Sequence, residues 1–379
     1  MTSAALWAWA QASPSRMATE MITPLLSKRG FLKAAGAGFA TSLLPRQADA
    51  LARTDAVFAA AFMAKDESYG VALLTEQGRE INRIALPDRG HDVCFDTTSP
   101  RAVAFARRPG TFALVFDTQT GKPVKLIEAA EDRHFFGHGV FSPDGKLLYV
   151  SENDFDNYAG MIGLYDVRSG YRKIGEFPAH GMDTHDIQLI EGGRYLAIAN
   201  GGIKQHPDTG RAKLNIDHME PSLVIVDLAD ARLVEKHDMP DDISQLSTRH
   251  MDMDAKGRVW FGCQFEGARN RHPQLLGSFR RGEDVRFIDI PEPVLRSFDN
   301  YVGSVTVNRD AGLVAISSPQ GGQWAAFETE TGKLAYEERI AGVCGLAREE
   351  KLFVRSTENG EFGTAKSELA WDNHITRLR

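Results

Sequence analysis

Short hydrophobic runs alternate with polar turns along most of the chain, and the spacing of these runs repeats. The clearest copies are HDVCFDTTSPRAVAFARRPGTFALVFDTQTGKPVKLIEA, which begins at His91, and HGVFSPDGKLLYVSENDFDNYAGMIGLYDVRSGYRKIGEF, which begins at His138. Each copy contains four runs of strand length rich in Val, Ile, Phe and Tyr, separated by turn residues such as the SPDG at 142–145. The pattern predicts units of four short antiparallel strands.

Further copies of the first strand place additional units along the chain. They follow one another at steps of 47, 47, 65, 54 and 40 residues, beginning at His91, His138, His185, His250, Ser304 and Cys344. The C-terminal run HITRL, which begins at His374, has the same opening but no hairpin partner after it. The N-terminal unit, Val57 to Leu86, has three runs and lacks a first strand. The two ends therefore complete one unit between them.

Units of four strands at this period are typical of β-propellers, in which each sheet packs on its neighbours. The 329 residues after position 50 would give seven units of 47, the length of the two cleanest steps. We therefore predict an all-β fold, a seven-bladed β-propeller closed by the C-terminal strand, which completes the first blade. Asp117, Asp166 and Asp227 end third strands before turns, where we expect them to accept hydrogen bonds from backbone amides.

The first fifty residues are interpreted as a leader rather than as part of the fold. Residues 27–50 contain a basic cluster, an uncharged stretch and Ala48-Asp49-Ala50, which is the pattern of a signal peptide with its cleavage site. The segment SKRGFLK at 27–33 resembles a twin-arginine motif with Lys28 in place of the first arginine; Sec export is the alternative. Met17 or Met21 is a plausible true start. We therefore expect a signal peptide at 1–50, one propeller domain at 51–379, and a periplasmic location.

Composition narrows the classes of partner. The chain has 44 basic and 51 acidic side chains, a formal charge of −7, which argues against a nucleic-acid binder. The uncharged stretch of the leader is too short to cross a bilayer. The three cysteines, Cys94, Cys263 and Cys344, form no disulfide framework and no C-x-x-C pair. We expect a monomer with no membrane span.

Five of the eleven histidines occupy equivalent positions at the start of inner strands. Because inner strands line the channel of a propeller, their side chains are predicted to converge near the axis: His91, His138, His185, His250 and His374. Imidazole is the commonest metal ligand, so such a ring is a candidate site for copper, iron or zinc. The alternative is structural, since Gly90-His91 and Gly137-His138 resemble the hydrogen-bonding Gly-His pair of WD-type propellers.

The ends of the second strands and the loops after them lie on the same face as this ring. They supply the candidate ligand-binding residues Arg107, Arg108, Glu152, Asn153, Asn200 and Gln264. A long loop at 201–222 adds Arg211 and Lys213, and we expect it to cover the site, because loops of this length are usually functional or disordered. The basic residues would suit an anionic ligand or an acidic partner.

Several segments resemble the bacterial DUF1513 family. They include AFARRPGT at 104–111, RHFFGHG at 133–139, SEND at 151–154, ANGGI at 199–203, HPDTGRAKLN at 206–215 and WDNH at 371–374. The resemblance implies an exported seven-bladed propeller of uncharacterised function. Genes of this family often lie beside those for imelysin-type proteins and di-haem cytochromes, which implies a periplasmic role in metal acquisition or redox chemistry.

These observations leave three functions open. The first is a periplasmic propeller that binds or handles a transition metal, in an iron or copper acquisition or redox system. The second is a non-enzymatic scaffold that docks a periplasmic cytochrome or an imelysin-type partner. The third is a lactonase-like hydrolase in which a metal or Glu152 activates water near Arg107 and Arg108.

Overall fold

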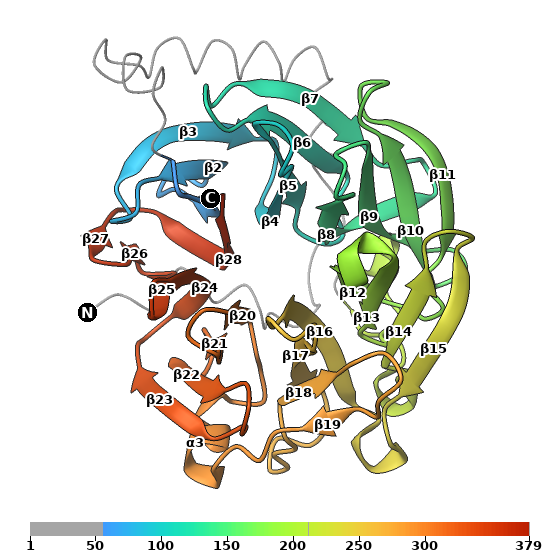
Figure 1. Cartoon of the computed structure of the whole chain (residues 1–379), viewed down its shortest axis with the longest axis vertical. Helices are drawn as coiled ribbons and strands as arrows, with labels where there is room; N and C mark the ends of the chain where they lie inside the picture. Colours follow the sequence, from blue (N-terminus) through green and yellow to red (C-terminus); the bar gives the residue numbers. More distant parts are fainter. Residues whose placement is uncertain (1–55, 211, 379) are drawn as a thin grey trace, which may run out of the picture.

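Seven antiparallel sheets of four strands each make up the part of the chain that the computed structural model describes, residues 56–210 and 212–378. The sheets stand around a common axis as the blades of a propeller (Figure 1). The predicted all-β, seven-bladed fold is therefore confirmed. The leader predicted at 1–50 lies outside the described residues.

Each blade has the same order of strands from the axis outward. Blade 1 contains β28 (Ala370–Arg377), β1 (Phe58–Met63), β2 (Tyr69–Leu74) and β3 (Glu80–Leu86). Blade 2 contains β4 (Gly90–Phe95), β5 (Arg101–Ala106), β6 (Phe112–Asp117) and β7 (Pro123–Glu128). Blade 3 contains β8 (Arg133–Phe141), β9 (Leu147–Asp154), β10 (Ala159–Asp166) and β11 (Arg172–Pro178). Blade 4 contains β12 (Thr184–Ile190), β13 (Tyr195–Asn200), β14 (Ser222–Asp227) and β15 (Arg232–Asp238).

The remaining blades follow the same order. Blade 5 contains β16 (Leu246–Met253), β17 (Val259–Phe265), β18 (Leu276–Phe279) and β19 (Arg286–Phe287). Blade 6 contains β20 (Ser304–Asn308), β21 (Leu313–Ser318), β22 (Gln323–Glu328) and β23 (Leu334–Arg339). Blade 7 contains β24 (Val343–Glu349), β25 (Leu352–Thr357), β26 (Glu361–Phe362) and β27 (Ala365–Lys366). Helical segments in the connections are short: η2 (Glu191–Gly193), η3 (Pro207–Thr209), η4 (Ile216–His218), η5 (Asp241–Ile243) and α3 (Glu292–Ser297).

The last strand closes the ring. β28 pairs antiparallel with β1, with Arg377 opposite Phe58 and Ala370 opposite Met63. In Figure 1 the red β28 lies beside the blue strands of the first blade. The predicted closure is confirmed, and it leaves the inner edge of β1 paired rather than open for aggregation.

The hydrophobic core lies between neighbouring blades. The cluster between blades 1 and 2, for example, contains Ala59, Val71, Leu114 and Phe116. Burial drops at the outermost strand: all six residues of β14 are buried, whereas β15 is mostly intermediate or exposed. Each blade is therefore held mainly by the two faces it presents to its neighbours, which fixes the inner strands as a rigid wall around the axis.

Turn chemistry agrees with the repeat. Asp117 Oδ1 accepts from the backbone amide of Thr120 at 2.8 Å, and Asp227 Oδ1 accepts from that of Ala229 at 2.9 Å. The predicted capping role of these aspartates is therefore observed. Among the described residues, no helix has the length and hydrophobicity that a membrane crossing requires.

Candidate metal centre

Five histidine side chains from five blades meet at the axis. They belong to the inner strands of blades 1 to 5 and are His374, His91, His138, His185 and His250. The ring centroids of His250 and His374 are 4.4 Å apart, and those of His91 and His374 are 4.6 Å apart. The repeat alignment thus identified side chains that do lie together, and their role as metal ligands stays a prediction.

Each of these histidines lies where the register of its inner strand breaks. The pairing with the neighbouring strand is interrupted between Gly90 and Val93 in β4, and between Thr248 and Met251 in β16. Similar breaks occur in β8, β12 and β28. A bulge bends a strand and re-aims its side chains. Consecutive residues can therefore both reach the axis, as His91 and Asp92 do.

Four of the histidines form a compact set of possible ligands. Their ring nitrogens all lie within 4.8 Å of one another, and all four residues are buried: His91, His138, His185 and His250. Ligands about 2.1 Å from a central ion lie about 3.4 Å apart in a tetrahedral site, and about 3.0 Å or about 4.2 Å apart in a square-planar site. The Nε2 atoms of His185 and His250 are 2.9 Å apart. A small shift toward the axis by the rings whose nitrogens lie farthest apart would therefore enclose an ion.

Asp372 of β28 fixes the ring of His91. Its Oδ1 lies 3.0 Å from His91 Nδ1, and because a carboxylate only accepts, Nδ1 carries the proton and Nε2 keeps its lone pair. Asp372 Oδ2 accepts from Arg89 Nε at 2.8 Å and from Arg107 Nη1 at 3.0 Å. Burial acts to raise the pKa of Asp372, but Arg107 and Arg89 hold it well below its usual value. Metal-ligating histidines commonly have such a carboxylate partner.

His138 has a similar environment. Its Nδ1 lies 3.1 Å from Asp92 Oδ2 and 3.5 Å from Asp186 Oδ1. Its Nε2 is buried and has no hydrogen-bond partner among the described residues, and the same is true of His374 Nε2. Buried polar atoms are normally satisfied, so each such nitrogen calls for an explanation. A metal ion at the axis would supply one.

Burial sets the charge state of the cluster. It is the first cause of a lowered pKa at all five rings: His91, His138, His185, His250 and His374. For His374 the pKa falls to about 4. The rings are therefore neutral at neutral pH, and neutral imidazole is the form that binds a metal.

Three carboxyl groups border the histidines on the side toward the ends of the inner strands. Asp92 and Asp186 contact His138, and Asp252 follows His250 by two residues on β16. Burial raises the pKa of Asp92 and Asp252, and it raises that of Asp186 to about 6. Asp186 Oδ2 also accepts from Met251 N at 2.7 Å, which ties blade 4 to blade 5.

Arg249 borders the histidines on the other side. It precedes His250 on β16, and its Nη1 lies 3.3 Å from His185 Nδ1. A guanidinium group only donates, so His185 Nδ1 accepts. Neutral His185 then carries its proton on Nε2, which faces the Nε2 of His250. In this arrangement His185 is a hydrogen-bond donor toward the axis rather than a metal ligand.

Two predicted ligand-binding residues lie at the same rim. Arg107 pairs with Asp372, which contacts His91. Arg108 pairs with Asp183, which is fully buried, and burial together with the nearby Arg249 lowers the pKa of Arg108 to about 10. Two guanidinium groups therefore lie near the cluster, where their positive charge would attract a bound anion.

Glu152 lies within blade 3 and points toward its outer strands. Its Oε1 accepts from Tyr165 Oη on β10, and its Oε2 accepts from Lys173 Nζ on β11, both at 2.6 Å. Burial raises the pKa of the Glu152 carboxyl group. These contacts account for both carboxylate oxygens, so the structure gives no support to Glu152 as a residue that activates water near Arg107 and Arg108.

Three other candidates also lie within their blades. Asn200 Oδ1 accepts from Thr184 Oγ1 at 2.8 Å, which links the first two strands of blade 4. Asn153 lies on β9 and is buried. Gln264 lies opposite Ser247 in the pairing of β17 with β16. Their proposed part in ligand binding remains a prediction.

The loop at 201–222 contacts residues of blade 5 and of the connections beside it. Its Lys213 pairs with Glu266, and Glu266 Oε1 in turn lies 3.5 Å from Arg249 Nη2. Two ion pairs therefore connect the loop to Arg249, which contacts His185, and its expected role as a cover stays a prediction. Arg211, the other loop residue proposed as a ligand-binding group, lies outside the described residues.

The polar residues that surround the histidines were not predicted from the sequence. Asp92 and Asp186 each directly follow a ring histidine, and Asp372 precedes His374 by two residues, so a signal was present. Arg249 directly precedes His250. In a regular strand adjacent side chains point to opposite faces, so the bulges are needed to bring both members of the adjacent pairs to the axis.

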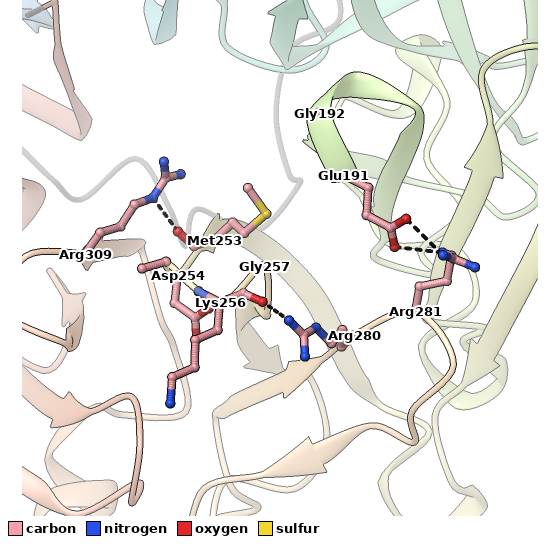
Figure 2. A pocket seen from close by; sticks show the side chains of 10 residues that line it. Glu191, Gly192, Met253, Asp254, Lys256, Gly257, Arg280, Arg281 and Arg309 are labelled. Carbon is pink, nitrogen blue, oxygen red and sulfur yellow. Dashed lines mark hydrogen bonds and ion pairs between the residues drawn. The ribbon is translucent and has the colours of Figure 1, made fainter.

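A separate recess lies at the opposite end of the inner strands. Figure 2 shows it lined by Glu191, Met253 and Lys256 among others, and its volume is about 570 Å³. The three arginines around it are all bound to neighbouring groups: Arg280 to Lys256 O, Arg281 to Glu191 Oε1 and Oε2, and Arg309 to Met253 O. The arginines of the recess therefore have hydrogen-bond partners, whereas several ring nitrogens of the histidine cluster have none among the described residues.

Comparisons with known proteins support the fold and the expected family. The sequence profile of a family described as a protein of unknown function, DUF1513, matches residues 84–378. No curated protein sequence matches the chain. A solved structure of hydrazine synthase from Kuenenia stuttgartiensis is similar with a TM-score of 0.58 and 12% identity, and the match covers 79% of this chain and 89% of that chain. At this identity the similarity shows a shared fold.

Proposed function

The chain belongs to the DUF1513 family of proteins of unknown function, and on that premise we propose that it is a periplasmic propeller that binds a transition metal ion at its axis. The proposed ligands come from the five axial histidines, and the ion is copper, iron or zinc. The observation that carries the proposal is that buried ring nitrogens of His91, His138 and His250 lie within 4.8 Å of one another.

Unsatisfied nitrogens favour a metal over a purely structural cluster. A structural histidine in a propeller uses its ring nitrogens in hydrogen bonds. Here His138 Nε2, His250 Nδ1 and His374 Nε2 are buried without a hydrogen-bond partner in the described part of the chain. Leaving such atoms unpaired costs about 1–3 kcal/mol each. Coordination of two or more of them by one ion would remove that cost.

The surrounding carboxyl groups suit a cation. Asp92, Asp186 and Asp252 have pKa values raised by burial, so each is costly to ionise while the axis holds only neutral rings. A divalent ion is the largest local charge in such a site and favours the ionised form of nearby carboxyl groups. Asp92 and Asp186 would then also hold the ring of His138 more firmly.

Imidazole donors determine the class of ion. Nitrogen-rich sites suit copper, zinc and iron, whereas calcium and magnesium prefer oxygen ligands. The set of possible ligands contains histidines and none of the described cysteines, Cys94, Cys263 and Cys344. When bound, the metal would supply redox or transport chemistry, while the chain supplies neutral imidazoles and excludes bulk water.

The cellular role is proposed on separate grounds. The leader pattern at 27–50 supports export to the periplasm. The family resemblance supports a place in an iron or copper acquisition or redox system, with an imelysin-type protein or a di-haem cytochrome as the partner. We place the partner on the face that carries the loop at 201–222, because Lys213 of this loop is linked through Glu266 to Arg249 beside the histidines.

Metal content tests the proposal directly. Metal-free protein is incubated separately with Cu²⁺, Zn²⁺ or Fe²⁺, desalted, and analysed for bound metal. We expect about one ion per chain, with a large loss in a double variant, His138→Ala and His250→Ala. The exposed His218→Ala is the matched control and should retain the ion. Wild-type protein that retains none of the three metals would overturn the proposal.

A further inference from the structure

Arg249 is a buried arginine with one edge of its guanidinium group unsatisfied. Its side chain is 2% exposed. Its Nη1 faces His185 Nδ1, whereas Nε and Nη2 have no hydrogen-bond partner among the described residues. Glu266 Oε1 lies 3.5 Å from Nη2 and compensates its charge without a hydrogen bond. The Nε–Nη2 edge is the one that binds a carboxylate through two parallel hydrogen bonds.

Basic side chains gather around this rim. Arg89 and Arg107 pair with Asp372, Arg108 pairs with Asp183, and Arg249 and Lys213 pair with Glu266. Burial raises the pKa of Glu358, which also interacts with Arg89, to about 7. Such a group of guanidinium and ammonium groups attracts an anionic ligand.

A second unsatisfied group lies near the same rim. Ser247, two residues before Arg249 on β16, is buried, and its Oγ has no hydrogen-bond partner within residues 56–210 and 212–378. Asp183 Oδ2 is likewise unpartnered in this part of the chain. Both atoms lie against the position where Gly201 lacks a side chain. The surroundings of Gly201 thus hold a hydroxyl group and a carboxylate oxygen that have no hydrogen-bond partner in this part of the chain.

The position of Arg249 also opposes metal binding by His185. A neutral histidine that ligates a metal through Nε2 must carry its proton on Nδ1. In the structure His185 Nδ1 faces Arg249 Nη1 at 3.3 Å, so two donors would then point at each other. His185 can join the ligand set only if the guanidinium group turns away from its Nδ1.

We propose that a small carboxylate binds the Nε–Nη2 edge of Arg249 and that its binding strengthens metal binding by the histidine cluster. The carboxylate draws the guanidinium group away from His185, the His185 proton moves from Nε2 to Nδ1, and Nε2 becomes a metal ligand. This inference rests on the proposed function. The two ligands are coupled, so each raises the affinity for the other by the same factor.

The test is a metal titration of the full chain in two buffers of equal ionic strength, one with sodium acetate and one with sodium chloride. We expect acetate to tighten metal binding roughly tenfold, within the usual range of coupling between two sites. A third buffer with inorganic phosphate distinguishes a planar carboxylate from a tetrahedral oxyanion. An equal or larger effect of phosphate would overturn the assignment to a carboxylate.

Variants of Arg249 distinguish acetate binding at this arginine from a general effect of salt on metal binding. Arg249→Gln removes the fork and the donor that faces His185, so this variant should bind metal more tightly than wild type in chloride and should not respond to acetate. Arg249→Lys keeps the charge but lacks the fork, and it should also fail to respond. Arg271→Gln alters an exposed arginine that donates to Asp242 O and should respond like wild type. Circular dichroism checks that each variant is folded.

In a further variant we expect the affinity for acetate to rise rather than fall. Glu266→Gln removes the carboxylate that lies beside the fork, so acetate should bind more tightly than in wild type. Metal binding that is unaffected by acetate in wild type and in Glu266→Gln would overturn the inference while the proposed function stands. If no metal binds in either buffer, the proposed function fails. In that case acetate binding is measured on the metal-free protein. Binding to wild type that is lost in Arg249→Gln would show that the anion site exists.

Discussion

Asp372 accepts a hydrogen bond from His91 Nδ1 at 3.0 Å, although 281 residues separate the two in the sequence. The contact joins the last strand of the chain to the inner strand of the second blade. It also connects the closure of the propeller to the orientation of a candidate ligand, since the same carboxylate receives Arg89 and Arg107.

Substitution of this carboxylate is expected to weaken metal binding without removing a ligand. Asp372→Asn keeps the size of the side chain but lowers the basicity that it confers on His91. We expect metal affinity to fall by roughly 10–100-fold, measured by competition with a chelator. The exposed Asp217→Asn on the loop at 201–222 serves as control. Unchanged affinity in Asp372→Asn would show that His91 is not a ligand.

The backbone of Gly137 lies against the ring of His91, so a side chain at this position would displace that ring. Its φ is +99°, and a Cβ there would lie 2.6 Å from His91 Cδ2. Gly137→Ala should therefore push the His91 ring, lower metal affinity roughly tenfold, and cost about 1–3 kcal/mol of stability. Gly170→Ala is the matched control, because its φ is +74° but nothing lies within 4 Å of the added Cβ. It should lose stability and keep its metal affinity.

The fold was predictable because its determinants are local. The SPDG turn at 142–145 and the aspartates at the ends of third strands set hairpins that recur at a readable period, and the incomplete first and last units indicated the closure. The convergence of the histidines followed from this register alone. None of these inferences required knowledge of a side-chain conformation.

The residues around the histidines were not predictable in the same way. In a regular strand Arg249 and His250 would point to opposite faces, and the break in pairing between Thr248 and Met251 is what brings both to the axis. A bulge leaves little trace in one sequence. Glu152 shows the reverse case, since its place at the end of a second strand suggested the rim, but its side chain points to Tyr165 and Lys173.

Trp371 anchors the closing strand. It is 2% exposed, and its ring centroid lies 5.3 Å from that of Phe362 and 6.2 Å from that of Phe62. We expect Trp371→Ala to lower the free energy of unfolding by about 3–5 kcal/mol, measured by urea denaturation. The exposed Tyr336→Ala on β23 should change it by less than about 0.5 kcal/mol. A loss of similar size in both variants would contradict the anchoring role.

The metal-free protein should become less stable as the pH falls below about 6.5. The five axial histidines have folded-state pKa values below their unfolded values, with that of His374 at about 4, so the unfolded chain takes up protons that the folded chain does not. The raised pKa values of Asp92, Asp186 and Asp252 offset part of this effect. Denaturation midpoints between pH 7 and pH 4 measure the slope.

A variant decides whether the axial rings cause this pH dependence. His374→Gln removes one buried imidazole and should flatten the decline, whereas the exposed His218→Gln should leave it unchanged. A decline of equal steepness in His374→Gln and wild type would assign the effect to other groups.

The nitrogen-rich ligand set predicts an order of affinity among metals. We expect Cu²⁺ to bind more tightly than Zn²⁺, and Zn²⁺ more tightly than Fe²⁺, because affinities at a given site generally follow this order. Pairwise competition followed by elemental analysis measures it. Preferential retention of Fe²⁺ over Zn²⁺ would indicate that protein geometry overrides the intrinsic order.

The closure of the ring by β28 has a consequence for the order of folding. Asp372 and His374 both lie on β28, which joins the first blade by pairing with β1. A folding intermediate in which β28 is still unpaired therefore lacks both groups at the axis, and the ring of His91 is then without its carboxylate partner.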